Sequence, residues 1–286
     1  MERELWQVFY GVAKKFDSGW GHWKFSEADI LLVYLWAVVH DRPTSWATKP
    51  ENWIEEIRPP VLPSQSTLSR RLRKASLQQF MTQIEETWLS LCGAAMIQIM
   101  DGKSLAVSRV SKDADASVGR GAGGMHKGYK LHAIWAEGPL PLAWSLTPLH
   151  VHEKRAAQAL LRDLPGQGYL LGDTAFDVNE LYDLAHESGY QLLAKKYRGG
   201  LGHRRHSPHR LRSIELLKGR FGKQLYAYRK QIERNFGTLT NFGGGLASLP
   251  AWVRRFPRVR HWVHAKLLIN AARWFRKNQP QLLALA

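Results

Sequence analysis

Three acidic residues occupy places in the sequence where an unpaired carboxylate would be costly. Asp101 lies in the apolar run AAMIQIMDGKSLAV, Asp173 ends the run GYLLGD, and Glu233 lies in an otherwise basic stretch. A carboxylate in an apolar strand must be paired or must bind a metal ion. Each acid alone could form a structural salt bridge, but the set is typical of an all-oxygen pocket for Mg²⁺ or Mn²⁺. Two such ions about 3.5–4 Å apart can activate an attacking hydroxyl and stabilise the leaving oxygen of a phosphodiester.

Positive charge is concentrated in one part of the chain. The whole chain carries 41 Lys and Arg against 24 Asp and Glu, a net charge of +17. Residues 195–260 alone contain seventeen basic residues and two acids, Glu215 and Glu233. A charge run can be a solvated face, but one with so few acids repels itself unless a partner neutralises it. The sequence therefore favours nucleic acid as the partner.

Length and composition limit the class of protein. A chain of 286 residues with 44% hydrophobic content can form one large domain or two modest ones. Its longest apolar run, 30–39, is about half of the ~20 residues that a membrane span needs. The acidic N-terminus is unlike a secretory signal, and the single Cys92 excludes an internal disulfide. We expect a cytoplasmic, nucleoid-associated protein with no membrane segment.

The first ninety residues are predicted to be helical. Ser26 and Asp29 are spaced as a capping box for an apolar helix that ends near Val39. A later segment, LPSQSTLSRRLRKASLQQF, places Leu68 and Leu72 on one face of a short basic helix. This helix could be an ordinary amphipathic helix, or it could enter the major groove of DNA as in a helix-turn-helix. In the second interpretation the DNA contacts are Arg70, Arg71 and Arg73.

The rest of the chain alternates strands with helices. Three strands, at 94–107, 127–136 and 141–149, indicate an antiparallel meander, and the Gly-rich segment 119–124 is predicted to be a flexible hairpin loop. A helix, a strand, a helix and a strand follow, which predicts a mixed five-stranded sheet with flanking helices. The later segments are predicted as a basic, loop-rich stretch at 197–225 and helices at about 226–241 and 259–277.

One segment has a specific resemblance. The sequence YAYRKQIERNFGTLTNF resembles the C-terminal signature of bacterial insertion-sequence DDE transposases, in which Tyr, Arg and Glu have the spacing of Tyr226, Arg229 and Glu233. The segment Asp173-Thr174-Ala175-Phe176 is similar to the sequence around the second acid of that family, and IMDGK and GMHKGYKLHAI are similar to its first two strands. The resemblance covers residues 94–277.

The resemblance implies a fold, a division of the chain and a set of site residues. It implies an α/β, ribonuclease-H-like catalytic domain at 91–286, preceded by an all-α, helix-turn-helix-like DNA-end-binding domain at 1–90. The basic loop 197–225 and the C-terminal helices belong to the second domain. Asp101, Asp173 and Glu233 would be catalytic and would bind two Mg²⁺ or Mn²⁺ ions. Tyr226 and Arg229 would position the DNA strand next to the cut, and Lys230 or Arg234 could contact the terminal phosphate. The concentration of charge in the loop, rather than the resemblance, predicts Arg204, Arg205 and Arg210 as further DNA contacts.

The resemblance also implies an activity. A member of this family binds the inverted-repeat ends of an insertion sequence, cleaves phosphodiesters and joins the 3′-hydroxyl ends to target DNA, working on double-stranded DNA as a homodimer. One position departs from the signature, because Thr240 stands where the family usually has Lys. The alternative is a transposase-derived DNA-binding protein or regulator that does not cut DNA.

Overall fold

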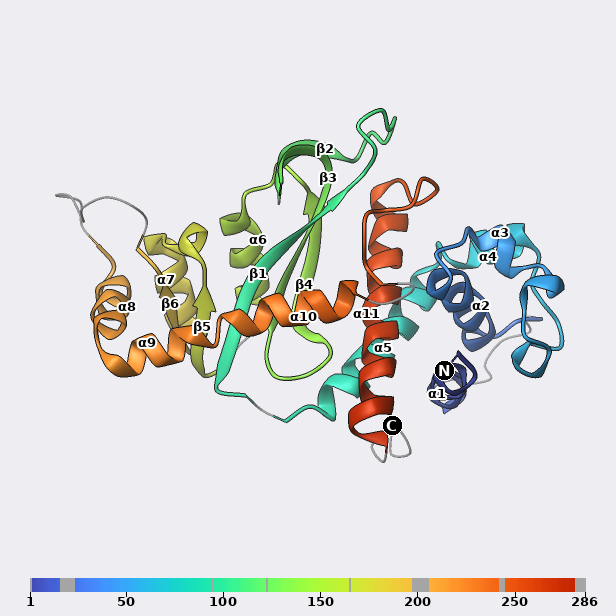
Figure 1. The fold of residues 1–286 in the computed structure, drawn as a ribbon, viewed down its shortest axis with the longest axis horizontal. Coiled ribbons are helices and arrows are strands. Elements are labelled where there is room, and N and C mark those ends of the chain that lie inside the picture. The colour runs from blue at the N-terminus through green and yellow to red at the C-terminus, as the bar shows by residue number, and fades with distance from the viewer. Residues whose placement is uncertain are drawn as a thin grey trace. The chain divides into compact units, whose positions relative to one another are not determined.

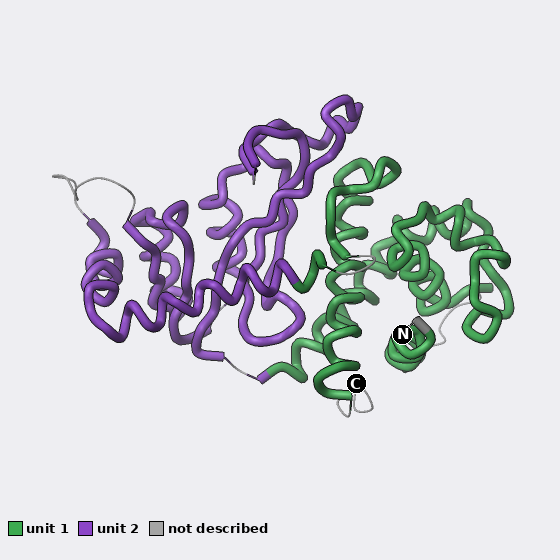
Figure 2. The backbone as a smooth tube through the Cα atoms, viewed as in Figure 1, with its two compact units in different colours: residues 1–92, 238–286 green, residues 93–237 purple. Residues whose placement is uncertain are grey.

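The computed structural model describes residues 2–15, 24–93, 95–121, 123–164, 166–196, 206–241 and 245–280. Residues 1–92 and 238–286 form one compact unit, and residues 93–237 form the other (Figure 2). The C-terminal helix therefore belongs to the same unit as the N-terminal helices. The division of the chain into a DNA-end-binding domain and a catalytic domain stays a prediction. No described helix is both long enough and apolar enough to cross a membrane.

The first unit is helical. Its apolar helix, α2 (Glu27–Val39), begins with the predicted capping box, in which Ser26 Oγ accepts a bond from the Asp29 N–H and the Asp29 carboxylate accepts one from the Ser26 N–H. Residues on all sides of α2 are buried, as its all-round apolarity predicts. Around it are α1 (Glu2–Lys15), α3 (Thr44–Ala47), α4 (Gln65–Arg71), α5 (Ala75–Ser90), α11 (Phe256–Asn278) and the 3₁₀ turns η1 (Pro50–Asn52) and η2 (Glu55–Ile57).

The predicted basic helix is present as α4, followed after a short turn by α5 (Figure 1). The Ser64 hydroxyl caps α4 by accepting a bond from the Thr67 N–H. Leu68 and Leu77 are completely buried, so the apolar stripe holds these two elements against the unit's core, while Leu72 is only partly buried. Two helices joined by a short turn agree with the predicted helix-turn-helix-like region.

The second unit is built on a mixed sheet. The strands are β1 (Ile97–Ala106), β2 (Ser117–Gly121), β3 (Gly124–Trp135), β4 (Pro141–Pro148), β5 (Gly168–Gly172) and β6 (Tyr190–Ala194). Their order is β2-β3-β1-β5-β6, with β4 also paired to β3. The pairs β1·β3 and β3·β4 are the antiparallel meander predicted from the sequence, and β5 and β6 add in parallel. The predicted mixed α/β class is confirmed.

The strand β2 corrects the prediction of a flexible loop at 119–124. Its residues pair antiparallel with β3, from Ser117 opposite Gly128 to Gly121 opposite Gly124. The sheet therefore has six strands rather than five. Glycine weakens strand propensity, but tertiary pairing overrides it here. Gly119 suits the position because an added Cβ would lie 2.6 Å from the Leu149 carbonyl oxygen.

The basic stretch after β6 also differs from its prediction. Its described part is helical rather than loop-rich, with α8 (Pro208–Lys218) and α9 (Arg220–Ala227). The predicted helix at 226–241 is divided, because α9 ends before Tyr228 and α10 (Lys230–Thr240) begins after Arg229. The predicted helices before it are present as α6 (Glu153–Arg162) and α7 (Asn179–Glu187), and a 3₁₀ turn, η3 (Thr174–Phe176), follows β5.

The two faces of the sheet carry different helices. Met100 and Ile134 belong to the apolar core that α6 and α7 form with β5 and β6. The neighbouring Trp135 packs edge-to-face on Phe236 of α10, with ring centroids 6.2 Å apart. Successive side chains of a strand point to opposite faces. Helix α10 therefore covers the face opposite to α6 and α7, and Asp101, next to Met100, points to the α10 face.

Candidate functional site

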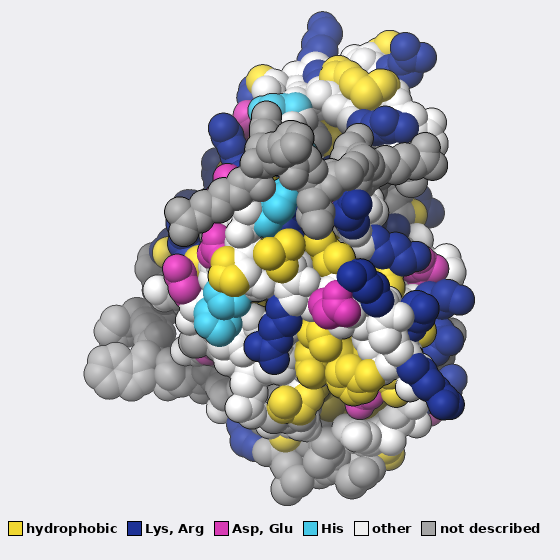
Figure 3. All heavy atoms as spheres, turned by 90° about the vertical axis from the view of Figure 1, so that its left-hand side faces the viewer, with side chains coloured by type: hydrophobic (Ala, Val, Ile, Leu, Met, Phe, Trp, Pro, Cys, Tyr) yellow, Lys and Arg dark blue, Asp and Glu magenta, His cyan; other side chains and the backbone are white. Residues whose placement is uncertain are grey.

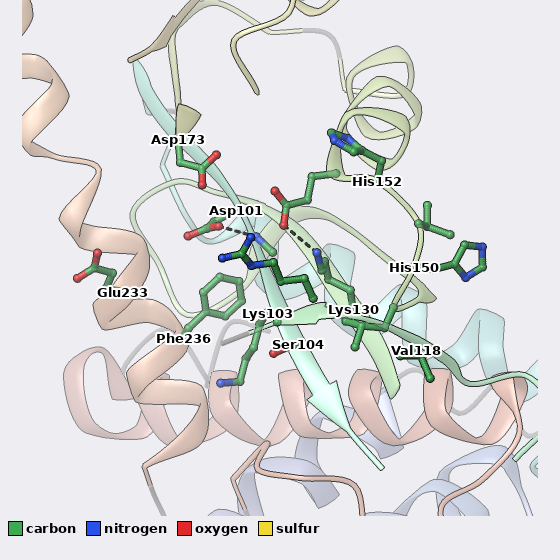
Figure 4. Close-up of a pocket in the computed structure, with 17 residues that line it drawn as sticks. Asp101, Lys103, Ser104, Val118, Lys130, His150, His152, Asp173, Glu233 and Phe236 are labelled. Carbon is green, nitrogen blue, oxygen red and sulfur yellow. Dashed lines mark hydrogen bonds and ion pairs between the residues drawn. The ribbon is translucent and has the colours of Figure 1, made fainter. Parts of the chain in front are cut away.

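A cavity of about 870 Å³ lies within the second unit and contains all three acids singled out from the sequence. Asp101 comes from β1, Asp173 from the end of β5, and Glu233 from α10 (Figure 4). Further lining residues come from β2, from the turn that follows β4 and from the first turn of α6. Elements far apart in the sequence thus bring three carboxylates to one cavity.

Asp101 is held in a partly buried position. One of its oxygens, Oδ1, accepts a bond of 2.7 Å from the Gly102 N–H. Burial raises the pKa of Asp101 to about 6; the backbone bond opposes this rise, and the charge of Asp173 adds to it. A carboxylate whose pKa is raised by burial and by a neighbouring carboxylate favours a bound cation.

Asp173 is fixed by the backbone that follows it. Its Oδ1 accepts a bond of 2.8 Å from the Ala175 N–H, which caps the turn η3. Burial is the main cause that raises the pKa of Asp173 above its usual value. The Tyr226 hydroxyl donates a bond of 2.8 Å to the carbonyl oxygen of Gly172, one residue before the acid. This bond anchors α9 beside Asp173, so the Tyr226 hydroxyl positions the site in this structure.

Arg229 lies between two of the acids. Its guanidinium is 3.7 Å from Asp101 Oδ2 and 4.0 Å from Glu233 Oε1. The Glu233 side chain is 68% exposed, much more than the 24% of Asp101. Among the described residues, no group of three or more His, Cys, Asp or Glu is close enough to hold one metal ion. The donor chemistry fits a hard divalent cation, since carboxylate oxygens are the ligands that Mg²⁺ and Mn²⁺ prefer.

Four charged residues of the cavity were not predicted from the sequence. Lys130 Nζ donates a bond of 2.9 Å to Glu153 Oε1, and both side chains are largely buried. Lys103 lies two residues after Asp101 on the same strand face, and Arg120 lies on β2. Burial lowers the pKa of Lys103. The one available sequence signal was the position of Lys103, because residues i and i+2 of a strand share a face.

The predicted DNA-binding residues of the first unit have two different environments. Arg70 and Arg73 are exposed. Arg71 is buried: its guanidinium lies 3.0 Å from Glu27 and donates a bond of 2.9 Å to the Phe25 carbonyl oxygen. Arg71 thus joins α4 to the start of α2. This structural contact differs from the DNA contact predicted from the sequence.

Arg210 has a structural role of the same kind. Its guanidinium makes two bonds of 2.7 Å to the carboxylate of Asp177, whose side chain is completely buried. This paired geometry does not agree with a free phosphate contact, which is the role predicted from the sequence. Arg204 and Arg205 lie outside the described residues. Lys230 and Arg234 are exposed on α10, and neither is among the described residues that line the cavity.

The face that carries α8 shows where basic side chains gather outside the cavity. Figure 3 looks onto this face, with an apolar patch near its centre and Lys and Arg side chains grouped along one margin. Leu211 and Phe221 of α8 and α9 are exposed, at 44% and 57%. The basic residues of the same two helices that are exposed are Arg212, Lys218, Arg220 and Lys223, so the predicted basic character of the stretch after β6 is present on the surface of its described part.

Comparison with protein families agrees with the geometry of the cavity. Residues 93–269 match the family model described as the transposase DDE domain. The match includes all three acids and every strand of the sheet. No curated protein and no solved structure is similar enough to the chain to give a match.

Proposed function

The chain belongs to the family of transposases with a DDE domain, and we propose that it binds the inverted-repeat ends of an insertion sequence, cuts them and joins them to target DNA. The family itself implies a nuclease-type transposase that acts on DNA and generally uses divalent metal ions. The observation that carries the proposal is the cavity that Asp101, Asp173 and Glu233 all line, each from a separate element.

The proposed reaction has two steps. Water attacks a phosphodiester at the element's end and frees a 3′-hydroxyl, which then attacks a phosphodiester of the target DNA. Each step exchanges one P–O bond for another, so the joining needs no external energy. Asp101, Asp173 and Glu233 would hold two Mg²⁺ or Mn²⁺ ions, which when bound would activate the attacking oxygen and stabilise the leaving one.

Other residues would position this site. Tyr226 keeps α9 against the end of β5, and Arg229 lies where it can neutralise charge near the two nearest acids. Because an element has two ends, which are cut and joined to the same target, we propose a homodimer in the DNA complex. The protein would then act on the DNA of the nucleoid, in the cytoplasm.

A nicking assay tests the proposal against its alternative. A supercoiled plasmid that carries the DNA on both sides of the gene is incubated with the full chain in Mg²⁺ or in EDTA. We expect nicked and linear products in Mg²⁺ but not in EDTA, because the carboxylates need a cation to activate water. Binding to the plasmid without any metal-dependent cut would favour the transposase-derived DNA-binding protein instead.

The first unit offers a test of base reading. Replacing the exposed Arg70 by Ala is expected to cost about 1–3 kcal/mol of discrimination between the element's end and random DNA, since a bidentate Arg–guanine contact supplies that much. Arg71→Ala is expected to lower the stability of the first unit, because it leaves Glu27 without this buried partner. Competition binding and urea unfolding measure the two effects. Equal loss on both DNAs for Arg70→Ala would make Arg70 a phosphate contact.

The basic segment after β6 is expected to bind the DNA backbone. Neutralising Arg204 and Arg205 together should flatten the slope of log K against log salt by nearly two units, since each phosphate contact contributes about 0.9. Sequence preference should hardly change, because backbone contacts carry little sequence information. Binding titrations at several salt concentrations measure the slope. A slope equal to that of the unchanged protein would assign this segment to another partner.

A further inference from the structure

Two cations of the catalytic cavity have no ion-pair partner in the part of the chain that the structure describes. Lys103 and Arg120 both line the cavity. The other lysine of the cavity, Lys130, is paired with Glu153, and Arg229 lies near Asp101. Lys103 is partly buried, where an unpaired cation is costly and an anionic ligand relieves that cost, whereas Arg120 is exposed and open to a ligand. These two residues are therefore available to a substrate.

The strand geometry separates Lys103 from the paired Lys130. Lys103 follows Asp101 by two residues on β1, so both side chains point to the face that α10 covers. Lys130 lies opposite Ser104 in the β1·β3 pairing and therefore points to the other face. Figure 4 shows the Lys130 side chain reaching toward the middle of the cavity, where it bonds to Glu153, and the Lys103 side chain extending in the other direction. Lys103 thus shares the face of the catalytic acids without being neutralised by Glu153.

We propose that Lys103 and Arg120 form a subsite for a backbone phosphate of the DNA strand in the cavity, next to the phosphate that is cut. This proposal rests on the proposed function, because the substrate is taken to be DNA. The two residues come from β1 and β2, and β3 pairs with both of these strands. The subsite is therefore built on the sheet itself.

The charge balance of the cavity supports such a subsite. Four carboxylates line the cavity: Asp101, Glu153, Asp173 and Glu233. Bound metal ions would neutralise Asp101, Asp173 and Glu233 at the cut, and Lys130 already neutralises Glu153. The charge that remains for a neighbouring phosphate is therefore that of Lys103 and Arg120. Lys103 and Arg120 supply fixed positive charge on the same wall. Lysine acts as a point charge and arginine as a planar fork, and both are common phosphate-binding groups.

The subsite also bears on the departure from the family signature. The signature lysine is replaced by Thr240. Lys230 and Arg234, the nearest basic residues on the same helix, are not among the described residues that line the cavity. Lys103 and Arg120 do line it, so the sheet offers positive charge for a phosphate inside the cavity.

Methylphosphonate scanning combined with one substitution tests the subsite. A synthetic duplex from the DNA flanking the gene receives single uncharged methylphosphonates at successive positions around the cleavage site. Binding to the full chain is measured without divalent metal, so that no strand is cut. At one position next to the cut, we expect the neutral linkage to weaken binding by the unchanged protein by about tenfold, as for a lost charged contact. The same linkage should have no further effect on Lys103→Met, because its partner charge is gone.

Matched variants keep the result specific. Lys112→Met and Arg109→Gln alter exposed cations of the same unit that do not line the cavity, and they should show the full tenfold loss at that position. Lys103→Arg should restore the coupling, and Arg120→Gln should reduce it. The subsite would be overturned if, at every position, the neutral linkage weakened binding by Lys103→Met as much as it weakens binding by the unchanged protein. Circular dichroism must show that the variant keeps its fold. That result differs from failure of the proposed function, in which the unchanged protein would not cut the same duplex when Mg²⁺ is added.

Discussion

Replacing Asp101, Asp173 or Glu233 by alanine, one at a time, is expected to abolish metal-dependent cleavage while DNA-end binding stays nearly unchanged. Removing even a residue that only orients a metal ligand typically costs about 10–100-fold, so losing a ligand should cost more. Asn or Gln at the same positions should be similarly inactive, since a neutral amide is a poorer ligand for Mg²⁺ than a carboxylate. Quantitative cleavage of end-labelled DNA measures the loss.

The three variants also separate cleavage from DNA binding. Each loses a charge that would bind metal rather than DNA, so gel-shift affinity in EDTA should remain within a factor of a few. The control is Glu215→Ala, which removes an exposed acid of α8 whose ion-pair partner among the described residues is the exposed Lys218. It should cut at the normal rate. Near-normal cleavage by any one of the three site variants would remove that residue from the catalytic set.

The second large effect concerns stability rather than chemistry. Arg210→Ala is expected to lower the free energy of unfolding by about 3–5 kcal/mol, because it leaves the completely buried Asp177 carboxylate without its bidentate partner. Arg212→Ala, two positions along α8 and exposed, should change stability by no more than about 0.5 kcal/mol. Urea unfolding measures both variants, as a shift in midpoint at constant slope.

Arg210→Lys provides a finer comparison. It restores a positive charge but not the planar fork, so it should regain only part of the lost stability. If Arg210→Ala unfolded at the same urea concentration as Arg212→Ala and flattened the salt dependence of DNA binding, Arg210 would be a DNA contact after all.

The sequence predicted the parts of the fold that depend on local pattern. The capping box of Ser26 and Asp29, the meander of β1, β3 and β4 and the alternation that follows are all set by spacing along the chain. A further start signal, Ser207 before Pro208, marks the beginning of α8, where the Ser207 hydroxyl caps the helix. This signal predicts a helix from Pro208, in spite of the high local charge of the segment.

The contacts that could not be predicted join residues far apart in the sequence. The local sequence places Arg71 on a basic, exposed helix, but its guanidinium donates a hydrogen bond to a carbonyl oxygen 46 residues earlier. Arg210 is paired with an acid 33 residues away, and Lys130 with one 23 residues away. No local pattern encodes such pairs. The three acids could be singled out because each is unusual within its own segment. Lys103 and Arg120 are not unusual in their segments, and it is the cavity they share with the acids that marks them as candidates.

The proposed function depends on Asp101, Asp173 and Glu233 together forming the metal site that cuts DNA. Its most direct test is a crystal structure of the full chain with a flanking-DNA duplex and Mn²⁺, with the metal located by anomalous scattering at the manganese edge. We expect two Mn²⁺ ions in the cavity, with Asp101 binding both, Asp173 and Glu233 binding one each, and oxygen ligands throughout. Manganese bound elsewhere, or a cavity filled by DNA with no ion on these carboxylates, would contradict it.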